Sequence, residues 1–118
     1  MIPEKRLDEY EWILLEKMKA HHYIGHSKTA LKDIRRGIPK HEAGNMDIAY
    51  DSLRKKGLFL YEIRKREPYF SINPKSVPHT NDLIRYNRCP LCNYYLENLN
   101  YCRECRKDIS SIRQQNEE

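Results

Sequence analysis

Four cysteines near the end of the chain form the clearest chemical pattern in the sequence. They are spaced as two C-x-x-C pairs with nine residues between them: Cys89, Cys92, Cys102 and Cys105. Each pair presents two sulfurs from a tight knuckle, and four thiolates at about 2.3 Å complete the tetrahedral shell of a structural zinc ion. Because that shell leaves no open position for water, we expect one structural Zn2+ and no catalytic metal.

Two other uses of these cysteines are open alternatives. Two disulfides would require an oxidising compartment, and the N-terminus opens with charges where a signal peptide has an apolar run. A redox-active dithiol normally uses one C-x-x-C at the start of a helix in a larger α/β fold. A metal fits better, so we predict a zinc ribbon over residues 87–110. Its spacer would fold as a hairpin around Glu97-Asn98, and Asn93 would tolerate the positive φ of a knuckle.

Positive charge is the second chemical feature, and it concentrates in the middle of the chain. Residues 20–66 hold eleven basic and five acidic side chains, or +6, whereas the rest of the chain sums to −1 and the whole chain to +5. Such a patch attracts phosphates, and a solvated charged face is the alternative interpretation. The candidate nucleic-acid contacts are Lys28, Lys32, Arg35, Arg36, Lys40, His41, Asn45, Ser52, Lys55, Arg64, Lys65 and Arg66.

No set of residues indicates an enzyme. The sequence contains no glycine-rich phosphate loop, no nucleophile–base arrangement and no convincing carboxylate pair. Helix ends and surface positions explain the five histidines, which are His21, His22, His26, His41 and His79. No stretch reaches the roughly 20 apolar residues of a membrane span, so we expect a cytoplasmic protein without a membrane partner.

The spacing of apolar residues predicts two helices in the first third of the chain. The first covers about residues 4–21 and starts after Pro3. The second is shorter, begins at Ser27 or Thr29 as the cap residue, and ends near Gly37.

A third helix is predicted over about residues 41–56, with Gly57 as its C-cap residue. Its buried stripe is predicted to contain Met46, Ala49, Tyr50 and Leu53, and its opposite face Asn45, Ile48, Ser52 and Lys55. Trp12 falls outside the apolar stripe of the first helix, so we expect it to cover the linker or a second subunit.

A hairpin and then a linker are predicted after the third helix. Residues 58–63 and 69–72 are rich in strand formers, and the polar residues 64–68 between them would form a turn with a basic tip. Residues 75–86 are predicted to be a linker that includes one helical turn, and residues 111–118 a polar tail.

The order helix, helix, helix, hairpin is that of a winged helix-turn-helix, in which the hairpin is the wing. Three segments surround the third helix and the wing. The segment before the third helix is Gly37-Ile38-Pro39-Lys40-His41, the segment that closes it is Leu53-Arg54-Lys55-Lys56-Gly57-Leu58, and the segment that ends the wing is Tyr69-Phe70-Ser71-Ile72-Asn73-Pro74. With them, residues from about 21 to 74, somewhat under half of the chain, resemble a group of small archaeal winged-helix proteins. The resemblance implies a mostly α fold with a small β part. A winged helix domain over residues 1–74 would then be followed by the four-cysteine zinc ribbon.

These features lead to three hypotheses about function. The first is a small archaeal DNA-binding protein that regulates transcription, because the basic residues lie on the parts of a winged helix that meet the backbone of duplex DNA. RNA or ribosome binding is the second, and a protein–protein adaptor on a larger machine is the third. Glu42, Asp47 and Asp51 on the third helix would repel phosphates, so we do not expect strong sequence specificity. A homodimer is an open alternative.

Overall fold

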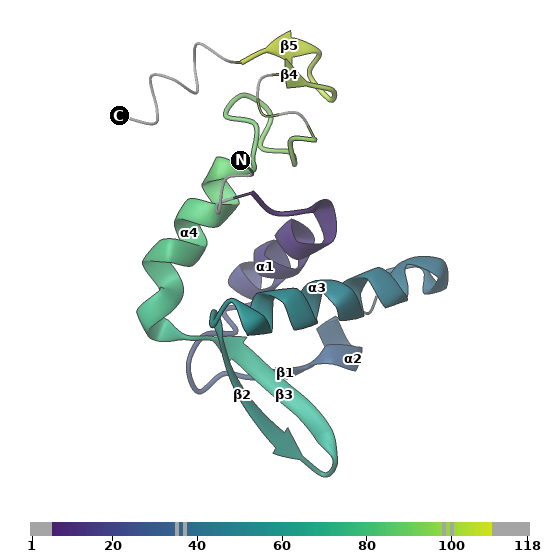
Figure 1. The fold of residues 1–118 in the computed structure, drawn as a ribbon, viewed down its shortest axis with the longest axis vertical. Coiled ribbons are helices and arrows are strands. Elements are labelled where there is room, and N and C mark those ends of the chain that lie inside the picture. Colours follow the sequence, from purple (N-terminus) through teal and green to yellow (C-terminus); the bar gives the residue numbers. More distant parts are fainter. Residues whose placement is uncertain (1–5, 35, 37, 98, 100, 110–118) are drawn as a thin grey trace.

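The computed structural model describes residues 6–34, 36, 38–97, 99 and 101–109. Helices and a small sheet make up most of the fold, and a cysteine-rich unit lies beyond one end of it (Figure 1). In chain order the elements are α1 (Glu9–Ala20), β1 (Thr29–Ala30), α2 (Leu31–Ile34), η1 (Lys40–Glu42), α3 (Ala43–Lys55), β2 (Phe59–Arg64), β3 (Glu67–Ile72), η2 (Pro74–Ser76), α4 (Val77–Tyr86), β4 (Tyr101–Cys102) and β5 (Lys107–Asp108). The described residues therefore form a small mixed α/β fold with four α-helices, a three-stranded antiparallel sheet and a cluster of four cysteines.

α1 begins at Glu9, later than the sequence predicted, because Asp8 caps it. The Asp8 carboxylate accepts a hydrogen bond from the Glu11 backbone N–H at 2.8 Å, and the Glu11 carboxylate accepts one from the Asp8 N–H at 3.1 Å. This reciprocal capping box satisfies two N–H groups that the first helical turn leaves unpaired. Pro3, the predicted start, lies outside the described residues.

The predicted second helix is reduced to one turn, because Thr29 and Ala30 pair with the sheet. They form β1, antiparallel to β3, with Thr29 opposite Phe70 and Ala30 opposite Tyr69. Backbone groups that hydrogen-bond to a neighbouring strand are not available to a helix, so α2 starts only at Leu31.

α3 matches its prediction closely. A 3-10 turn, η1, leads into the helix, and Gly57 follows it with a φ of 78° that suits glycine. Its buried residues are Met46, Ala49, Tyr50 and Leu53, as the apolar periodicity indicated. Three of the four residues predicted to lie opposite are exposed (Asn45, Ile48 and Lys55), whereas Ser52 is half-buried.

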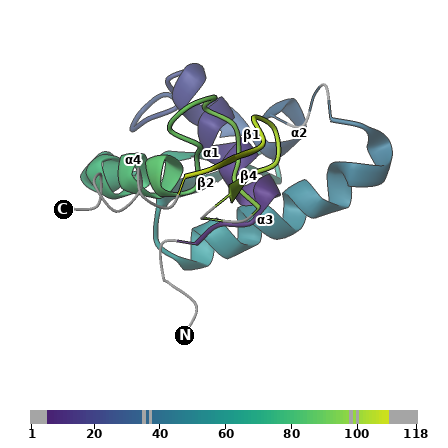
Figure 2. The same ribbon diagram turned by 90° about the horizontal axis from the view of Figure 1, so that it is seen from above.

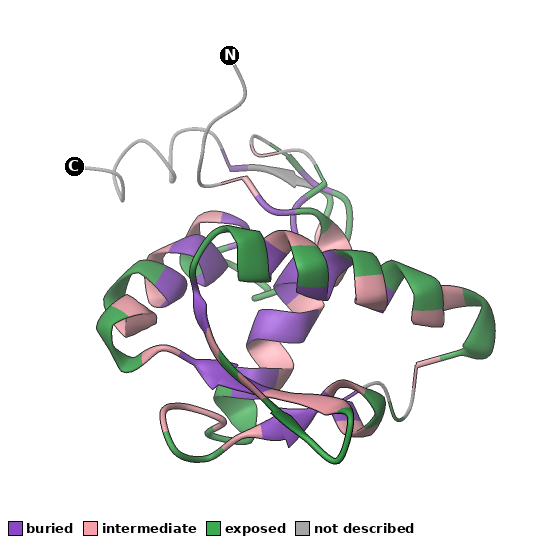
Figure 3. Cartoon of the chain, turned by 60° about the horizontal axis from the view of Figure 1, so that its bottom comes forward, coloured by how far each residue is buried: buried purple, intermediate pink, exposed green. Residues whose placement is uncertain are grey.

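The hairpin of β2 and β3 has a tighter turn than predicted. Arg64 pairs with Glu67 and Ile63 with Pro68, so only Lys65 and Arg66 remain in the turn. Their φ values of 50° and 66° are both left-handed, as in the two-residue turns that match the twist of a hairpin. In the sheet order β1-β3-β2, the hairpin is buried where it leaves the core and exposed toward its basic tip (Figure 3).

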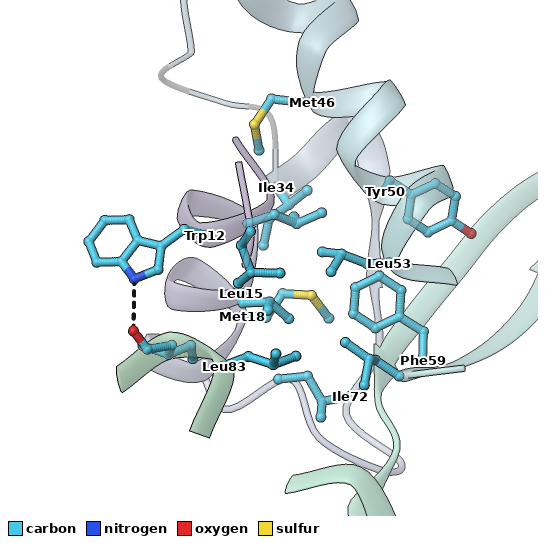
Figure 4. Close-up of a cluster of buried hydrophobic side chains, with 14 of the residues drawn as sticks. Trp12, Leu15, Met18, Ile34, Met46, Tyr50, Leu53, Phe59, Ile72 and Leu83 are labelled. Carbon is cyan, nitrogen blue, oxygen red and sulfur yellow. Dashed lines mark hydrogen bonds between the residues drawn. The ribbon is translucent and has the colours of Figure 1, made fainter. Parts of the chain in front are cut away.

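One hydrophobic core lies between α1, α3, α4 and the sheet. Side chains from α1 (Leu15, Met18), α3 (Leu53) and the strands (Phe59, Ile72) meet at its centre (Figure 4). Tyr50, Phe59 and Phe70 form an aromatic group whose ring centroids lie 4.5 to 6.0 Å apart, which is the range favoured for tilted or offset rings.

The segment 75–86, predicted to be a linker, is helical instead. Pro74 and Pro78 fall in the first turns of η2 and α4, where a missing N–H costs nothing, so these prolines start helices. α4 buries Thr80, Leu83 and Ile84. Trp12 of α1 donates a hydrogen bond from Nε1 to the Ile84 carbonyl at 3.2 Å and thus covers this segment within the same chain (Figure 4).

The carboxylate of Glu11 ties the start of α1 to the end of α3. Its Oε2 accepts hydrogen bonds from Ser52 Oγ at 2.9 Å and from Lys56 Nζ at 3.0 Å. Burial alone would raise the pKa of Glu11, but hydrogen bonds from the Asp8 backbone and from the Lys56 and Ser52 side chains hold that pKa below its ordinary value. The half-buried Ser52 therefore faces α1 through its hydroxyl and does not lie on an open helix face.

None of the helices in the described residues combines the length and the apolar character needed to cross a bilayer.

Leu53→Ala should lower the free energy of unfolding by about 2–5 kcal/mol, because it leaves a cavity where α1, α3 and the strands meet. Lys55→Ala, two residues later on the exposed face, should change it by less than about 0.5 kcal/mol. Urea unfolding of the two variants, followed by circular dichroism, measures both values. Equal losses would mean that α3 does not use this face for packing.

Glu11→Gln should lower the free energy of unfolding at neutral pH by about 1–3 kcal/mol, because hydrogen bonds to a charged carboxylate are weakened. The folded-state pKa of Glu11 is depressed, so the wild-type carboxylate stabilises fully above the unfolded value of about 4.3 and loses this effect as pH falls through the folded pKa. The difference between the two proteins should therefore shrink below about pH 4 in urea melts. Glu9→Gln in the same turn, as the control, should cost less than about 1 kcal/mol.

Candidate metal centre and candidate nucleic-acid surface

The four cysteine sulfurs come together in a single cluster. All four Sγ atoms lie within 4.8 Å of one another, with 3.8 Å between Cys89 and Cys105 and 3.5 Å between Cys92 and Cys102. Sulfurs bound to one tetrahedral zinc at about 2.3 Å lie about 3.8 Å apart, so the cluster has the size of that coordination shell. All four thiols are free, in contrast to the disulfide alternative. The donor set therefore fits a metal ion.

Backbone geometry explains why the two knuckles present their sulfurs to a common point. In the first, the Cys89 N–H donates to the Tyr94 carbonyl at 2.8 Å, the Asn93 N–H donates to the Cys89 carbonyl at 2.9 Å, and the Leu91 N–H points to Cys89 Sγ at 3.4 Å. Asn93 has a φ of 62°, as predicted. Arg106, which follows the second knuckle at the equivalent position, has a φ of 55°.

The described residues at the two ends of the spacer pair outward, away from each other, and not as the predicted hairpin. Tyr101 and Cys102 of β4 pair with β5, on the far side of the second knuckle, and Tyr95 bridges Arg88, on the far side of the first. The second knuckle is thus closed by β4 and β5, and the first by the single bridge between Arg88 and Tyr95. Asn98, in the predicted turn of the spacer, lies outside the described residues.

The close approach of the thiols shifts the pKa values of Cys102 and Cys105 in opposite directions. Burial opposes ionisation of Cys102, but the Cys105 backbone N–H and the neighbouring thiols lower its pKa to about 7. Burial and hydrogen bonds to Cys102 and Cys89 raise the pKa of Cys105 to about 12. Four thiols this close cannot all ionise near neutral pH without a cation, and a bound metal supplies the charge that allows it.

Three residues join this unit to the rest of the fold, and no motif in the sequence indicated that role: Arg6, Asn87 and Tyr95. Arg6 and Asn87 hydrogen-bond to each other, and Tyr95 donates a hydrogen bond to the Leu7 carbonyl. They belong to no motif, and their partners lie 81 and 88 positions away in the chain. No local pattern could have identified them. Seen from above, the cysteine-rich unit lies over α1 (Figure 2).

Basic residues of α2 and of the hairpin lie side by side. Lys32 of α2 forms an ion pair with Glu67 at 3.1 Å, directly beside the turn of Lys65 and Arg66. Arg64 forms an ion pair with Glu62, and its guanidinium lies 5.0 Å from the centroid of the Tyr69 ring. The structure therefore brings together four of the predicted contact residues at one end of the hairpin.

The other predicted contact residues are distributed over different surfaces. Lys28 is half-buried and donates to the Gly25 carbonyl at 3.3 Å, and Arg36 pairs with Asp33 at 3.2 Å. Lys40, His41, Asn45 and Lys55 are exposed along η1 and α3. Ser52 faces Glu11, and Arg35 lies outside the described residues.

Apolar side chains are exposed where α3 and β2 meet the solvent. Ile48 is 67% exposed, Ile63 64% and Tyr61 45%. The Arg54 guanidinium lies 5.6 Å from the centroid of the Tyr61 ring, which links α3 to the hairpin on this side. Asp51, an exposed carboxylate on α3, pairs with the same Arg54 at 3.6 Å.

Comparisons with protein-family models, with curated proteins and with solved structures found no match for this chain.

One zinc ion per chain is the expected metal content, and Cys102→Ser should abolish stoichiometric binding because it removes a buried ligand. Atomic emission on purified protein, together with thiol counting after denaturation, measures both. Tyr101→Phe, the neighbouring change on an exposed side chain, should retain one zinc. Purified wild-type protein with two disulfides and no metal would contradict the assignment.

Proposed function

We propose that this protein binds nucleic acid as a winged helix with a structural zinc centre, and that its target is duplex DNA in a transcriptional role. The observation that carries the proposal is the hairpin tip. There Arg64, Lys65 and Arg66 stand at the end of two strands, away from the core. A cation in that position reaches a phosphate backbone without bringing the body of the protein into contact.

The order of elements supports the winged-helix interpretation. α1, α2 and α3 precede the β2–β3 hairpin, and β1 completes a three-stranded sheet with it. In a winged helix the third helix and the wing form the contact surface, and here α3 leads directly into β2 through Gly57. The fold by itself does not identify the partner, so we argue the partner from the distribution of charge.

Charge at the tip favours a polyanion. No carboxylate among the described residues pairs with Lys65 or Arg66, whereas Lys32 and Arg64 are neutralised by Glu67 and Glu62. The two turn residues therefore keep their full charge for an external anion. Lys40 and His41, exposed in η1 just before α3, add two further donors on another part of the surface.

Base reading is expected to contribute less than phosphate contact. Asn45 and Lys55 are exposed on α3, but they share this helix with Asp47 and Asp51, which repel phosphates. Affinity should therefore depend on the backbone and on salt, with modest preference among sequences.

Zinc is the metal that we assign to the cysteine cluster. Four thiolates are soft ligands in a tetrahedral arrangement, which suits Zn2+ and leaves no coordination position for catalysis. When bound, the ion would contribute folding energy to a small unit in which, among the residues that the structure describes, the buried core consists of Leu96, Ile109 and cysteines.

Docking on another protein is a second candidate function. The three exposed apolar side chains on α3 and β2 are the observation that favours it, because exposed apolar side chains that gather into a patch mark protein interaction sites. RNA binding would use the same tip cations as duplex DNA.

The double variant Lys65→Asn/Arg66→Gly tests the leading proposal. It removes both charges and introduces the Asn-Gly pair that left-handed two-residue turns prefer, so the hairpin should remain folded. Each lost phosphate contact lowers the slope of log affinity against log salt by about 0.9, so the slope should fall by up to about 1.8. Fluorescence anisotropy with a labelled duplex over a salt series measures it.

A variant with the same charge loss, Lys19→Ala/Lys75→Ala, is the matched control, because both lysines are exposed and lie outside the hairpin. An unchanged slope in the Asn-Gly variant would show that the tip is not a DNA contact. Tighter binding of structured RNA than of any duplex would favour RNA, and the absence of nucleic-acid binding at physiological salt would favour the docking function.

A further inference from the structure

The segment before α1 lies between the helical core and the cysteine-rich unit. Leu7 is 1% exposed, its N–H donates to Asn87 Oδ1 at 3.1 Å, and its carbonyl accepts a hydrogen bond from the Tyr95 hydroxyl at 2.6 Å. Arg6 donates to Asn87 Oδ1 and to the Glu97 carbonyl, each at 2.8 Å. Both backbone groups of Leu7 are therefore held by residues that flank the first cysteine knuckle.

Asn87 connects three parts of the chain at one buried position. It is 0% exposed and lies two residues before Cys89, at the C-terminal end of α4. Its Nδ2 donates to the Leu83 carbonyl at 2.8 Å, and its own carbonyl accepts from the Leu96 N–H at 2.9 Å. Because a buried amide is costly unless its hydrogen bonds are made, Asn87 favours an arrangement in which the knuckle, α4 and the N-terminal segment pack together.

Tyr95 belongs to the hydrophobic core although it stands in the cysteine-rich unit. Its side chain is 9% exposed within the core cluster, and its ring centroid lies 5.8 Å from that of Trp12. Trp12 lies 6.4 Å from the ring of Tyr94 in the same knuckle. Arg88, next to Cys89, reaches Glu16 of α1 at 3.4 Å.

The contacts continue from the N-terminal segment to the end of α3. Leu7 is followed by Asp8, whose capping box positions Glu11, and Glu11 accepts hydrogen bonds from Ser52 and Lys56. Lys56 immediately precedes Gly57 and the hairpin. A continuous series of buried and half-buried polar contacts thus runs from the first knuckle to the point where α3 passes into β2.

We propose that the cysteine-rich unit and the helical core fold as one cooperative unit, so that metal binding at the four cysteines stabilises α1, α3 and the start of the hairpin. The linkage runs through Tyr95 and Asn87 to Leu7. This inference rests on the metal assignment proposed above and not on nucleic-acid binding. A separable zinc ribbon behind a flexible linker would instead fold on its own, and metal binding would then leave the stability of the helices unchanged.

The consequence is a fold whose stability depends on the supply of metal. A ligand that binds only the folded state stabilises it in proportion to the logarithm of its concentration over its dissociation constant. If the two parts are one cooperative unit, this stabilisation reaches the helices. The stability of the surface formed by α3 and the hairpin then depends on metal binding, although this surface does not contact the metal.

Thermal unfolding with and without a chelator tests the coupling in the full-length protein. Far-UV circular dichroism follows the helices, and the fluorescence of Trp12, the single tryptophan, follows the contact with the knuckle. Removal of the metal should lower the midpoint of the helical transition by at least about 4 °C and shift the Trp12 emission. A helical midpoint that stays unchanged after the metal has been removed would overturn the proposal.

Two matched variants test the route of the coupling. Tyr95→Phe keeps the ring but removes the hydrogen bond to Leu7, and Tyr94→Phe makes the same chemical change on a side chain that is 51% exposed. Both should bind one zinc, but the chelator-induced shift of the helical midpoint should be smaller in Tyr95→Phe than in Tyr94→Phe and wild type. Equal shifts would overturn the assignment to Tyr95.

Measuring the metal content distinguishes a failure of the coupling proposal from a failure of the metal assignment. A chain that binds one zinc, yet melts in two independent transitions, contradicts the coupling alone. A chain that binds no zinc contradicts both, and atomic emission shows this before any melt is recorded.

Discussion

A buried carboxylate at the start of α1 imposes the constraint on which the rest of the arrangement depends. Glu11 is 5% exposed, and a buried charge is tolerated only if it is paired and hydrogen-bonded. It accepts from Asp8, Ser52 and Lys56, so the start of α1, the end of α3 and the entry to β2 must stay in register. The same capping box fixes where the chain enters α1 after Leu7, whose backbone is hydrogen-bonded to Asn87 and Tyr95 beside the first knuckle.

The small size of the chain explains why hydrogen bonds and ion pairs between its elements are needed for stability. A chain of 118 residues buries a modest core, and here part of its length is in a unit whose interior contains few apolar side chains. A metal ion bound to the four cysteines would supply cross-linking that hydrophobic burial provides poorly at this size. Because Tyr95 lies in the main core, the proposed cross-link would act on the helices as well as on the knuckles.

The hairpin carries a cationic surface and an apolar surface at different positions. Counting charge along the sequence did not distinguish them. Cations occupy its tip, where a left-handed turn projects Lys65 and Arg66 away from the body, while Tyr61 and Ile63 lie exposed closer to α3. In the two proposed functions, phosphate contact would use the tip, and apolar contact would use the face beside α3. The two candidate functions use different parts of the molecule and are not mutually exclusive.

The sequence alone determined those features that follow from local rules. The cysteine spacing predicted the cluster of sulfurs, apolar periodicity predicted the buried face of α3, and composition predicted a basic hairpin tip, because each depends on residues close together in the chain. Only the tertiary structure decided that Thr29 and Ala30 join a sheet, that residues 75–86 form helices on the core, and that Tyr95 and Asn87 hold Leu7. Those outcomes depend on partners such as Leu7 and Tyr95, 88 positions apart, whose hydrogen bond forms only once the intervening helices have brought them together.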